Sequence, residues 1–249
     1  MSETAVQLLC LPCAGASATM YLRWRRLLPR WIAITPVELP GRGGRLGERF
    51  VEDFDALADQ LCEELAPRLA PATPFALFGH SMGALLAHGL AQRLRERGGR
   101  MPLALIASGS AAPSRRDTAR LQRVIGDEAA LVADLRRQGG TPEEVFANAE
   151  LLRLTLDVLG ADYRVCASYR HEARAPLPVP LHVLAGRQDE IAPERLAAWS
   201  AESTLPMTLD WFDGGHFFVR QQEGAVLAAL ARHLSAAGAR AVPATDAFA

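Results

Sequence analysis

A short apolar run leads directly into a serine flanked by glycines at residues 75–83, Phe-Ala-Leu-Phe-Gly-His-Ser-Met-Gly. Gly79-x-Ser81-x-Gly83 is the pattern of a nucleophile elbow, in which a serine sits on a strained turn between a strand and a helix. Glycine is needed two positions away on either side because a Cβ there would collide with the crossing backbone. The pattern therefore constrains the local fold and the chemistry of Ser81 together.

The sequence on both sides of this motif supports the interpretation. Residues 75–78 are apolar and of strand length, and leucines recur at helical spacing over residues 82–97. This context is important because the chain contains 20 glycines, and a bare three-position match arises by chance in roughly one such chain in ten. A strand before the serine and a helix after it are what an elbow requires.

Apolar strands and helical segments alternate along the rest of the chain. The predicted strands cover residues 6–11, 32–37, 75–78, 103–107, 181–185 and 207–212, and the predicted helices cover 20–28, 53–69 and 82–97. This alternation predicts an α/β fold with a mostly parallel central sheet and helices on both faces. With 249 residues and 49% hydrophobic content, the chain is expected to form a single domain over residues 1–249.

Two segments depart from the alternation. Between residues 113 and 176 only helical patterns occur, which predicts a helical insertion at the edge of the sheet. Its position favours a lid that controls access to Ser81, and an ordinary covering layer is the alternative. Residues 237–249 are rich in alanine and are predicted to form a flexible tail.

Composition excludes several classes of function. A formal net charge of −1 gives no overall attraction to nucleic acid or to anionic membranes. The amino terminus lacks the basic and apolar regions of a signal peptide, and the apolar stretches are only of strand length, so a cytoplasmic protein is expected. All 27 basic residues are arginine, which removes lysine from every catalytic role.

Two of the four cysteines form a Cys10-x-x-Cys13 pair. A zinc site would need a second close pair, whereas Cys62 and Cys166 stand alone, so neither a metal nor a cofactor is expected. We expect Cys10 to be a buried apolar residue at the end of the first strand and Cys13 to be a loop residue near the active site. A dithiol redox role is the alternative.

A serine nucleophile needs a general base, and functional residues of a parallel sheet gather at the carboxyl ends of its strands. Asp189 follows the strand at 181–185, and His216 follows the strand at 207–212. The chain order Ser81, Asp189, His216 is that of α/β-hydrolases. These three residues are the predicted catalytic triad.

Other residues compete for the acid and base positions. Asp213 lies only three residues before His216 and is better placed to shape that loop, and Asp117 is a more distant candidate for the acid. The remaining histidines are expected to be hydrogen-bonded structural residues; they are His80, His88, His171, His182 and His233.

The oxyanion hole is predicted from backbone N–H groups. One donor is the N–H of Met82, directly after the nucleophile and at the positive end of the following helix. The second should come from the loop after the first strand, where small residues over 12–16 permit close approach of the backbone.

Five motifs together resemble the type II thioesterases of nonribosomal peptide and polyketide synthesis. They are Pro-Cys-Ala-Gly-Ala at 12–16, Glu-Leu-Pro-Gly-Arg-Gly-Gly-Arg at 38–45, the elbow at 79–83, Gly-Arg-Gln-Asp at 186–189 and Gly-Gly-His-Phe-Phe at 214–218. The resemblance covers nearly the whole chain, and it is particularly close to thioesterases of pyochelin-type siderophore clusters. It implies an α/β-hydrolase fold with a helical lid.

The resemblance also implies an activity. Such enzymes hydrolyse acyl or aminoacyl groups from the phosphopantetheine arm of carrier proteins and thereby clear misprimed or stalled synthases. Matched residue by residue, Ser81, Asp189 and His216 correspond to the triad of the family, and Met82 and Ala14 to its oxyanion donors. Cys13 and Ala16 depart from the family pattern, which could alter the pocket but not the backbone donors. Acyl-carrier and peptidyl-carrier domains are the expected partners of a monomeric enzyme.

Two other classes of protein stay open. A small-molecule carboxylesterase or acyl-CoA thioesterase of the same fold would share the triad, whereas a non-catalytic binding protein of this fold would need none of its members. Four arginines are predicted to attract an acidic carrier protein to the entrance of the site; they are Arg42, Arg45, Arg115 and Arg116.

Overall fold

A parallel six-stranded sheet lies at the centre of the chain. The computed structural model describes residues 5–69 and 72–241. The strands are β1 (Val6–Leu11), β2 (Ile32–Pro36), β3 (Phe75–His80), β4 (Leu105–Ser108), β5 (Leu181–Gly186) and β6 (Met207–Phe212). Their order is β2-β1-β3-β4-β5-β6, and all pairings recorded in this sheet are parallel. This confirms the predicted α/β fold and its central sheet.

The predicted strand boundaries differ from the observed ones by no more than two residues. The largest extension is at β3, which continues through Gly79 to His80. Both residues stay in the sheet because Gly79 pairs with Leu11 of β1 and His80 pairs with Ser108 of β4. The strand therefore runs up to the serine itself.

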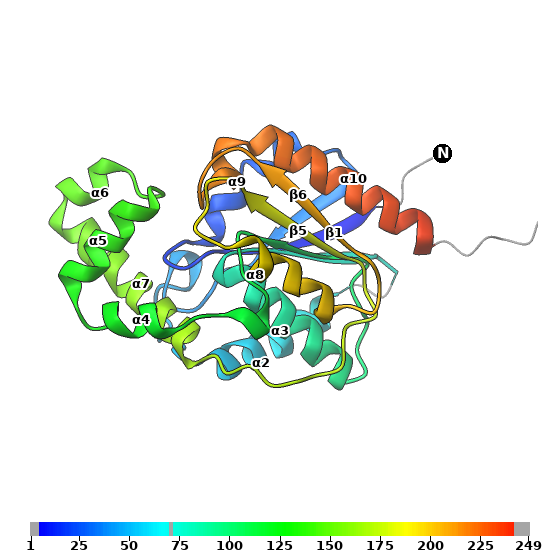
Figure 1. Cartoon of the computed structure of the whole chain (residues 1–249), viewed down its shortest axis with the longest axis horizontal. Helices are drawn as coiled ribbons and strands as arrows, with labels where there is room; N and C mark the ends of the chain where they lie inside the picture. The colour runs from blue at the N-terminus through cyan, green and yellow to red at the C-terminus, as the bar shows by residue number, and fades with distance from the viewer. Residues whose placement is uncertain (1–4, 70–71, 242–249) are drawn as a thin grey trace, which may run out of the picture.

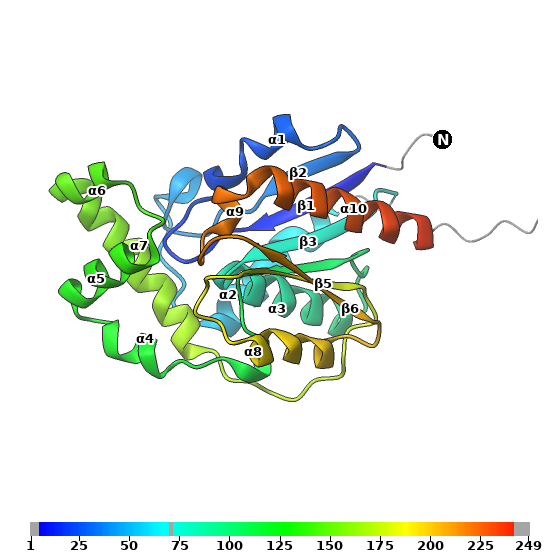
Figure 2. The same ribbon diagram turned by 45° about the horizontal axis from the view of Figure 1, so that its top comes forward.

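Helices cover both faces of the sheet (Figures 1 and 2). One face packs against α1 (Trp24–Leu27) and α10 (Glu223–Ala241), and the other against α2 (Phe54–Leu65), α3 (Met82–Glu96) and α8 (Pro193–Ala197). Because helices cover both faces, β3 is buried at each of its positions. Strands of this kind typically have continuous apolar sequences rather than alternating ones.

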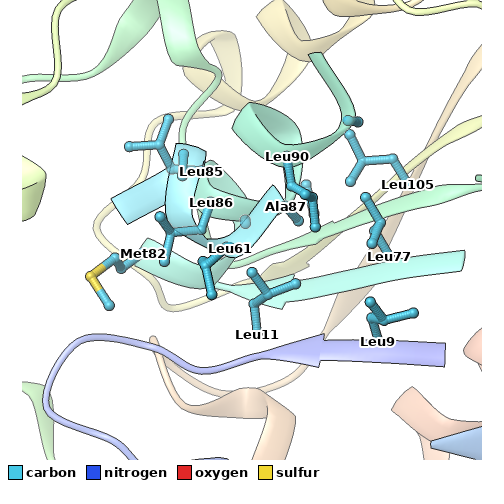
Figure 3. Close-up of a cluster of buried hydrophobic side chains, with 14 of the residues drawn as sticks. Leu9, Leu11, Leu61, Leu77, Met82, Leu85, Leu86, Ala87, Leu90 and Leu105 are labelled. Atoms are coloured by element: carbon cyan, nitrogen blue, oxygen red, sulfur yellow. The ribbon is translucent and has the colours of Figure 1, made fainter. Parts of the chain in front are cut away.

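The core between the sheet and α3 consists mainly of leucine. Figure 3 shows leucines of the strands meeting leucines of α2 and α3, all of them nearly inaccessible to solvent; they are Leu9, Leu11, Leu77, Leu105, Leu61, Leu85, Leu86 and Leu90. Close packing on this face holds the amino end of α3 against the carboxyl ends of β1 and β3.

Residues 20–28 do not form the single predicted helix. A 3₁₀ turn, η1 (Ala18–Tyr21), precedes the short α1. The hydroxyl of Tyr21 donates to the carbonyl of Leu11 over 2.9 Å, and its ring packs on Trp24 and Phe78 with centroids 4.9 and 5.7 Å away. Tertiary packing of these aromatic rings outweighs the local helical pattern.

The segment between β4 and β5 folds into helices beyond the carboxyl ends of the strands (Figure 2). They are α4 (Ala119–Val124), α5 (Glu128–Gln138), α6 (Glu143–Ala147) and α7 (Ala149–Ser168). These helices enclose a small core of their own, formed by Leu131, Leu135, Leu156, Leu159 and Tyr163. Because α7 also contacts α2, the insertion is attached to the main body of the fold.

The remaining helices of the described residues are short: η2 (Gly43–Arg45), η3 (Ala66–Arg68), η4 (Pro113–Arg115), η5 (Ala198–Glu202) and α9 (Phe218–Gln221). At the carboxyl end, α10 continues to Ala241, so residues 237–241, which were predicted to belong to a flexible tail, are helical. The remaining residues of the predicted tail lie outside the described part of the chain. None of the helices in 5–69 and 72–241 combines the length and hydropathy that crossing a bilayer requires.

The junction of β3 and α3 has almost no free space around its backbone. Ser81 adopts φ 55° and ψ −113°, and it is the one non-glycine residue with positive φ in the described part of the chain. A Cβ on Gly79 would lie 2.0 Å from the carbonyl oxygen of Gly83, and a Cβ on Gly83 would lie 2.2 Å from that of Leu11. The two glycines allow α3 to cross the end of β1, as the elbow pattern predicts.

A buried ion pair connects the insertion to the loop after β1. Asp162 of α7 accepts a hydrogen bond of 2.8 Å from the Gly15 N–H and contacts the guanidinium of Arg42 at 2.5 and 2.6 Å. The two side chains are 1% and 6% exposed, and Arg42 also donates to the carbonyl of Ala16. Burial raises the pKa of the Asp162 carboxyl, whereas Arg42 and the Gly15 N–H act against that rise and favour the ionised form.

The close approach at Gly83 predicts a large loss of stability for Gly83→Ala. The added methyl group would overlap a backbone carbonyl that cannot move without displacing β1, so we expect unfolding to cost at least about 3 kcal/mol less than in the wild type. Urea unfolding followed by circular dichroism measures this. Gly47→Ala is the control, because a Cβ there has no neighbour within 4 Å and the change should stay within about 0.5 kcal/mol. Equal stability of both variants would contradict the crossing geometry.

The buried ion pair predicts that Asp162→Asn lowers the free energy of unfolding by about 3–5 kcal/mol, because it leaves the Arg42 guanidinium buried without a counter-charge. Asp157→Asn, on the exposed side of the same helix, should change it by no more than about 0.5 kcal/mol. The same urea titration compares the two. A loss below about 1 kcal/mol at Asp162 would mean that the pair contributes little to holding the loop.

Candidate active site

Asp189 and His216 meet at the carboxyl ends of β5 and β6. The Nδ1 atom of His216 lies 2.9 Å from Oδ2 of Asp189, whose side chain is only 8% exposed. Both residues line the same cavity as Ser81, which has a volume of about 420 Å³. Among the described residues no hydrogen bond joins Ser81 Oγ to His216, and such a contact is often long until a substrate is bound.

The two alternative acids have other partners. The carboxylate of Asp213 pairs with Nε of Arg187 at 3.3 Å, and its side chain is 78% exposed. Asp117 lines the cavity but accepts a hydrogen bond from the N–H of Ala119. Asp189 is therefore the carboxylate that orients the imidazole of His216.

His80 lies beside His216 in the protein interior. The centroids of the two rings are 5.2 Å apart, and Nδ1 of His80 is 3.0 Å from the hydroxyl of Ser108. Burial lowers the pKa of His80 well below its usual value, and the charges of His216 and Arg220 act in the same direction. A neutral His80 therefore adds no positive charge next to His216.

Three further histidines have hydrogen-bonding partners, as expected for structural residues. His88 contacts Glu202, His182 contacts Thr208, and His233 contacts Asp210. None of the three lines the cavity that contains Ser81.

Of the two backbone groups expected to form the oxyanion hole, that of Ala14 lies in the wall of this cavity and that of Met82 directly follows Ser81. Met82 is the first residue of α3, so its N–H has no acceptor within the helix, and Ala14 lines the cavity directly. In the described part of the chain neither N–H donates to another protein group. Both groups therefore have a free donor, as an oxyanion hole requires.

The thiols of the Cys10-x-x-Cys13 pair are buried and free. Cys13 lines the cavity, and burial raises the pKa of its thiol to about 12. Since the thiolate is the reactive form, a thiol that stays protonated at neutral pH is poorly suited to dithiol exchange. Within the described residues no group of three or more His, Cys, Asp or Glu side chains could hold a metal ion.

The four arginines predicted to attract a carrier protein lie in different environments. Arg42 is buried with Asp162, Arg45 is paired with Glu48 and Glu64, and Arg116 lines the cavity. Arg115 is exposed at the surface. The prediction is wrong for Arg42, whose side chain is buried against Asp162, whereas a docking role for Arg115 and Arg116 stays a prediction.

The role of Asp162 was missed in the sequence, although a signal for it exists. Asp162 shares the apolar face of its helix with Leu156 and Leu159, so its carboxylate is directed toward the core. A charge in that position needs a buried partner, which the sequence pattern does not identify.

Comparisons with known proteins agree with this geometry. A family model described as a thioesterase domain matches residues 6–237. The thioesterase PikA5 of Streptomyces venezuelae is 34% identical over 239 residues, which cover 93% of this chain and 82% of that protein. Two solved structures are also similar. RedJ, a thioesterase of the prodiginine pathway in Streptomyces coelicolor, has a TM-score of 0.85 at 35% identity and covers 92% of this chain and 91% of its own.

BorB, a type II thioesterase from the borrelidin cluster, has a TM-score of 0.81 at 39% identity, with 94% of this chain and 92% of its own covered. The shared fold is that of the α/β-hydrolases, as expected from the order of Ser81, Asp189 and His216. Since the family match spans nearly the whole described chain, and the strained serine shares a cavity with a hydrogen-bonded histidine, this chain belongs to the thioesterase family.

Proposed function

We propose that this chain is a serine thioesterase that removes acyl or aminoacyl groups from the phosphopantetheine arm of carrier proteins and so clears misprimed or stalled nonribosomal peptide and polyketide synthases. The observation that carries the proposal is the Asp189–His216 hydrogen bond beside Ser81 in one cavity of a thioesterase-family chain. BorB and RedJ, which belong to biosynthetic pathways, support the choice of substrate class.

In the first half of the proposed reaction, Oγ of Ser81 attacks the thioester carbonyl carbon while Nε2 of His216 accepts the hydroxyl proton. Asp189 holds the Nδ1–H tautomer and stabilises the imidazolium that forms. The N–H groups of Met82 and Ala14 stabilise the oxyanion of the tetrahedral intermediate. When this intermediate collapses, the C–S bond breaks and His216 returns the proton to the departing sulfur.

In the second half, a water molecule attacks the acyl-serine carbonyl, and His216 accepts a proton from that water. The Ser81–acyl bond then breaks, the proton passes to Oγ, and the free acid leaves. Water must reach the acyl-enzyme beneath the helices α4–α7, so the insertion acts as a lid over this step.

Several features of the proposal concern the setting of the enzyme. Acyl-carrier and peptidyl-carrier domains are the proposed partners, the enzyme is proposed to act as a monomer, and a cytoplasmic location stays a prediction. A siderophore pathway of the pyochelin type also stays a prediction, since the similar structures come from pathways as different in name as those of prodiginine, borrelidin and yersiniabactin.

Ser81→Ala tests the covalent mechanism. Carrier domains loaded with different acyl groups are incubated with enzyme, and intact-protein mass spectrometry follows loss of the acyl mass. The wild type should deacylate at least part of the panel, whereas Ser81→Ala should be slower by several orders of magnitude, because no other hydroxyl replaces the nucleophile. Residual activity above about one hundredth of the wild-type rate would contradict a serine acyl-enzyme.

The same acyl groups presented as simple aryl esters distinguish the alternative functions. A carrier-directed thioesterase should have the higher kcat/KM on the carrier-bound thioester, and preference for the aryl ester would indicate a carboxylesterase. Labelling of Ser81 by a fluorophosphonate is expected as well. Failure to label it would favour a non-catalytic protein of the same fold.

The two carboxylates near His216 should differ in their effect on turnover. Asp189→Asn removes the partner that sets the tautomer of His216, so kcat should fall roughly a thousandfold or more. Asp213→Asn affects an exposed pair with Arg187 and should change kcat less than about threefold. Steady-state kinetics on one acyl-carrier substrate measures both variants, and the opposite ranking would assign the acid role to Asp213.

A further inference from the structure

Two arginines that line the active-site cavity, Arg116 and Arg195, form no ion pair among the described residues, and of the two only Arg116 has a buried nitrogen without a partner. Arg116 follows η4 and lines the cavity together with Ser81. Its Nη1 donates to the hydroxyl of Ser110 over 3.2 Å, and its Nε is sealed from solvent without a hydrogen-bond partner. In the described part of the chain Arg116 forms no ion pair with a carboxylate. The guanidinium of Arg116 therefore loses hydrogen bonds to water at Nε without gaining a protein partner for that atom.

The other arginines that line the cavity are in a different situation. Arg120 and Arg137 share the buried carboxylate of Asp134, and Arg137 also pairs with Glu190. Arg195 also forms no ion pair in the described part of the chain, but its guanidinium donates twice to the backbone carbonyl of Arg115 and none of its nitrogens is buried without a partner. Arg116 thus differs from Arg120 and Arg137 in having only neutral partners.

Among the described residues no carboxylate lies within ion-pair distance of the Arg116 guanidinium, although the adjacent Asp117 lines the same cavity and accepts from the N–H of Ala119. Burial raises the pKa of the neighbouring Cys166 thiol to about 11, an effect that Arg116 only partly opposes, so this thiol stays neutral. Asp162 and Glu202 also act on groups near Arg116, but Asp162 is held by Arg42. The carboxylate of Glu202 lies 3.1 Å from Nε2 of His88.

A guanidinium that is partly desolvated and unpaired is a preorganised site for a carboxylate, which it can bind through two parallel hydrogen bonds. A purely apolar acyl group in the same cavity would leave the guanidinium charge of Arg116 without a partner. A site with a buried polar group rejects substrates that cannot pair with it more strongly than an apolar pocket rejects substrates of slightly different size.

We infer that Arg116 forms a subsite for a carboxylate on the acyl group, so that thioesters of dicarboxylic acids are preferred over apolar acyl groups of the same shape. This inference rests on the proposed thioester hydrolysis and specifies its substrate class. Two other roles for Arg116 are tested against it. The guanidinium could bind the phosphate of the carrier arm, or it could merely attach the start of the insertion to Ser110.

The test uses three pairs of acyl groups with matched shape. Malonyl, succinyl and glutaryl are compared with isovaleryl, 4-methylpentanoyl and 5-methylhexanoyl, in which two methyl groups replace the carboxylate oxygens. Each group is supplied as the N-acetylcysteamine thioester, which has no phosphate, and on a carrier domain. Wild type, Arg116→Met and Arg123→Met are assayed for thiol release or acyl loss. Arg123 is the control because it is exposed and lies outside the cavity wall.

For at least one chain length, the wild type should have a higher kcat/KM for the dicarboxylic member than for its branched partner. Arg116→Met should reduce that ratio by about 10–100-fold with both kinds of thioester, as expected for losing a charge-assisted bidentate contact. Arg123→Met should leave the ratio unchanged. Arg116→Lys, which keeps the charge but loses the planar fork, should give an intermediate ratio.

Other results would overturn the inference. If the wild type prefers the branched group at all three chain lengths, no carboxylate subsite exists. The wild-type enzyme alone decides this outcome. If Arg116→Met lowers kcat/KM equally for both members of each pair, Arg116 has a structural role. If it lowers kcat/KM only for carrier-bound substrates, Arg116 binds the phosphate of the carrier arm. Hydrolysis of branched but not dicarboxylic groups removes only this inference. Hydrolysis of none of the six groups, free or carrier-bound, removes the proposed thioesterase function with it.

Discussion

The contact on which the site depends is the crossing of α3 over the end of β1. Gly83 lies so close to the carbonyl of Leu11 that no side chain fits between them, and Gly79 is equally close to the backbone of Gly83. This crossing places Ser81 and the free N–H of Met82 directly beside the loop that follows β1. Because that loop carries Ala14, one steric constraint brings Ser81, with the N–H of Met82 that follows it, close to the second candidate oxyanion donor. The strained backbone of Ser81 is retained because the leucine core on either side of it holds both elements in position.

The helical insertion contributes more than a cover. Through Asp162 it reaches the Gly15 N–H, so the carboxylate of one helix fixes the peptide next to Ala14. Through Arg116, Arg120 and Arg137 it also supplies much of the charge in the cavity wall. If the insertion acts as the proposed lid, its movement would change the shape of the candidate oxyanion loop and the charges in the cavity wall together.

The parts of the fold that could be predicted from the sequence are those with a local signal. The elbow, the strands and the long helix after Ser81 were predicted because apolar runs, glycines and leucine spacing act within a few residues of one another. Residues 20–28 were predicted wrongly because the aromatic contacts of Tyr21 with Trp24 and Phe78 decide their conformation. The same holds for Arg42, which reads as a surface loop residue until its partner, 120 residues further along the chain, is brought beside it.

Sequence alone determined the order and chemical identity of Ser81, Asp189 and His216, because each follows a recognisable strand and the carboxyl ends of parallel strands share one edge. Only the tertiary structure shows that Asp189, 27 residues before His216, turns inward to its imidazole, whereas Asp213, three residues before it, is exposed and paired with Arg187. It also shows that Arg120 and Arg137 in the cavity wall are paired with Asp134, whereas Arg116 has only neutral partners among the described residues. The physical reason is that the pairing of a buried charge depends on segments distant in the chain, whereas a sequence pattern reports only on neighbours.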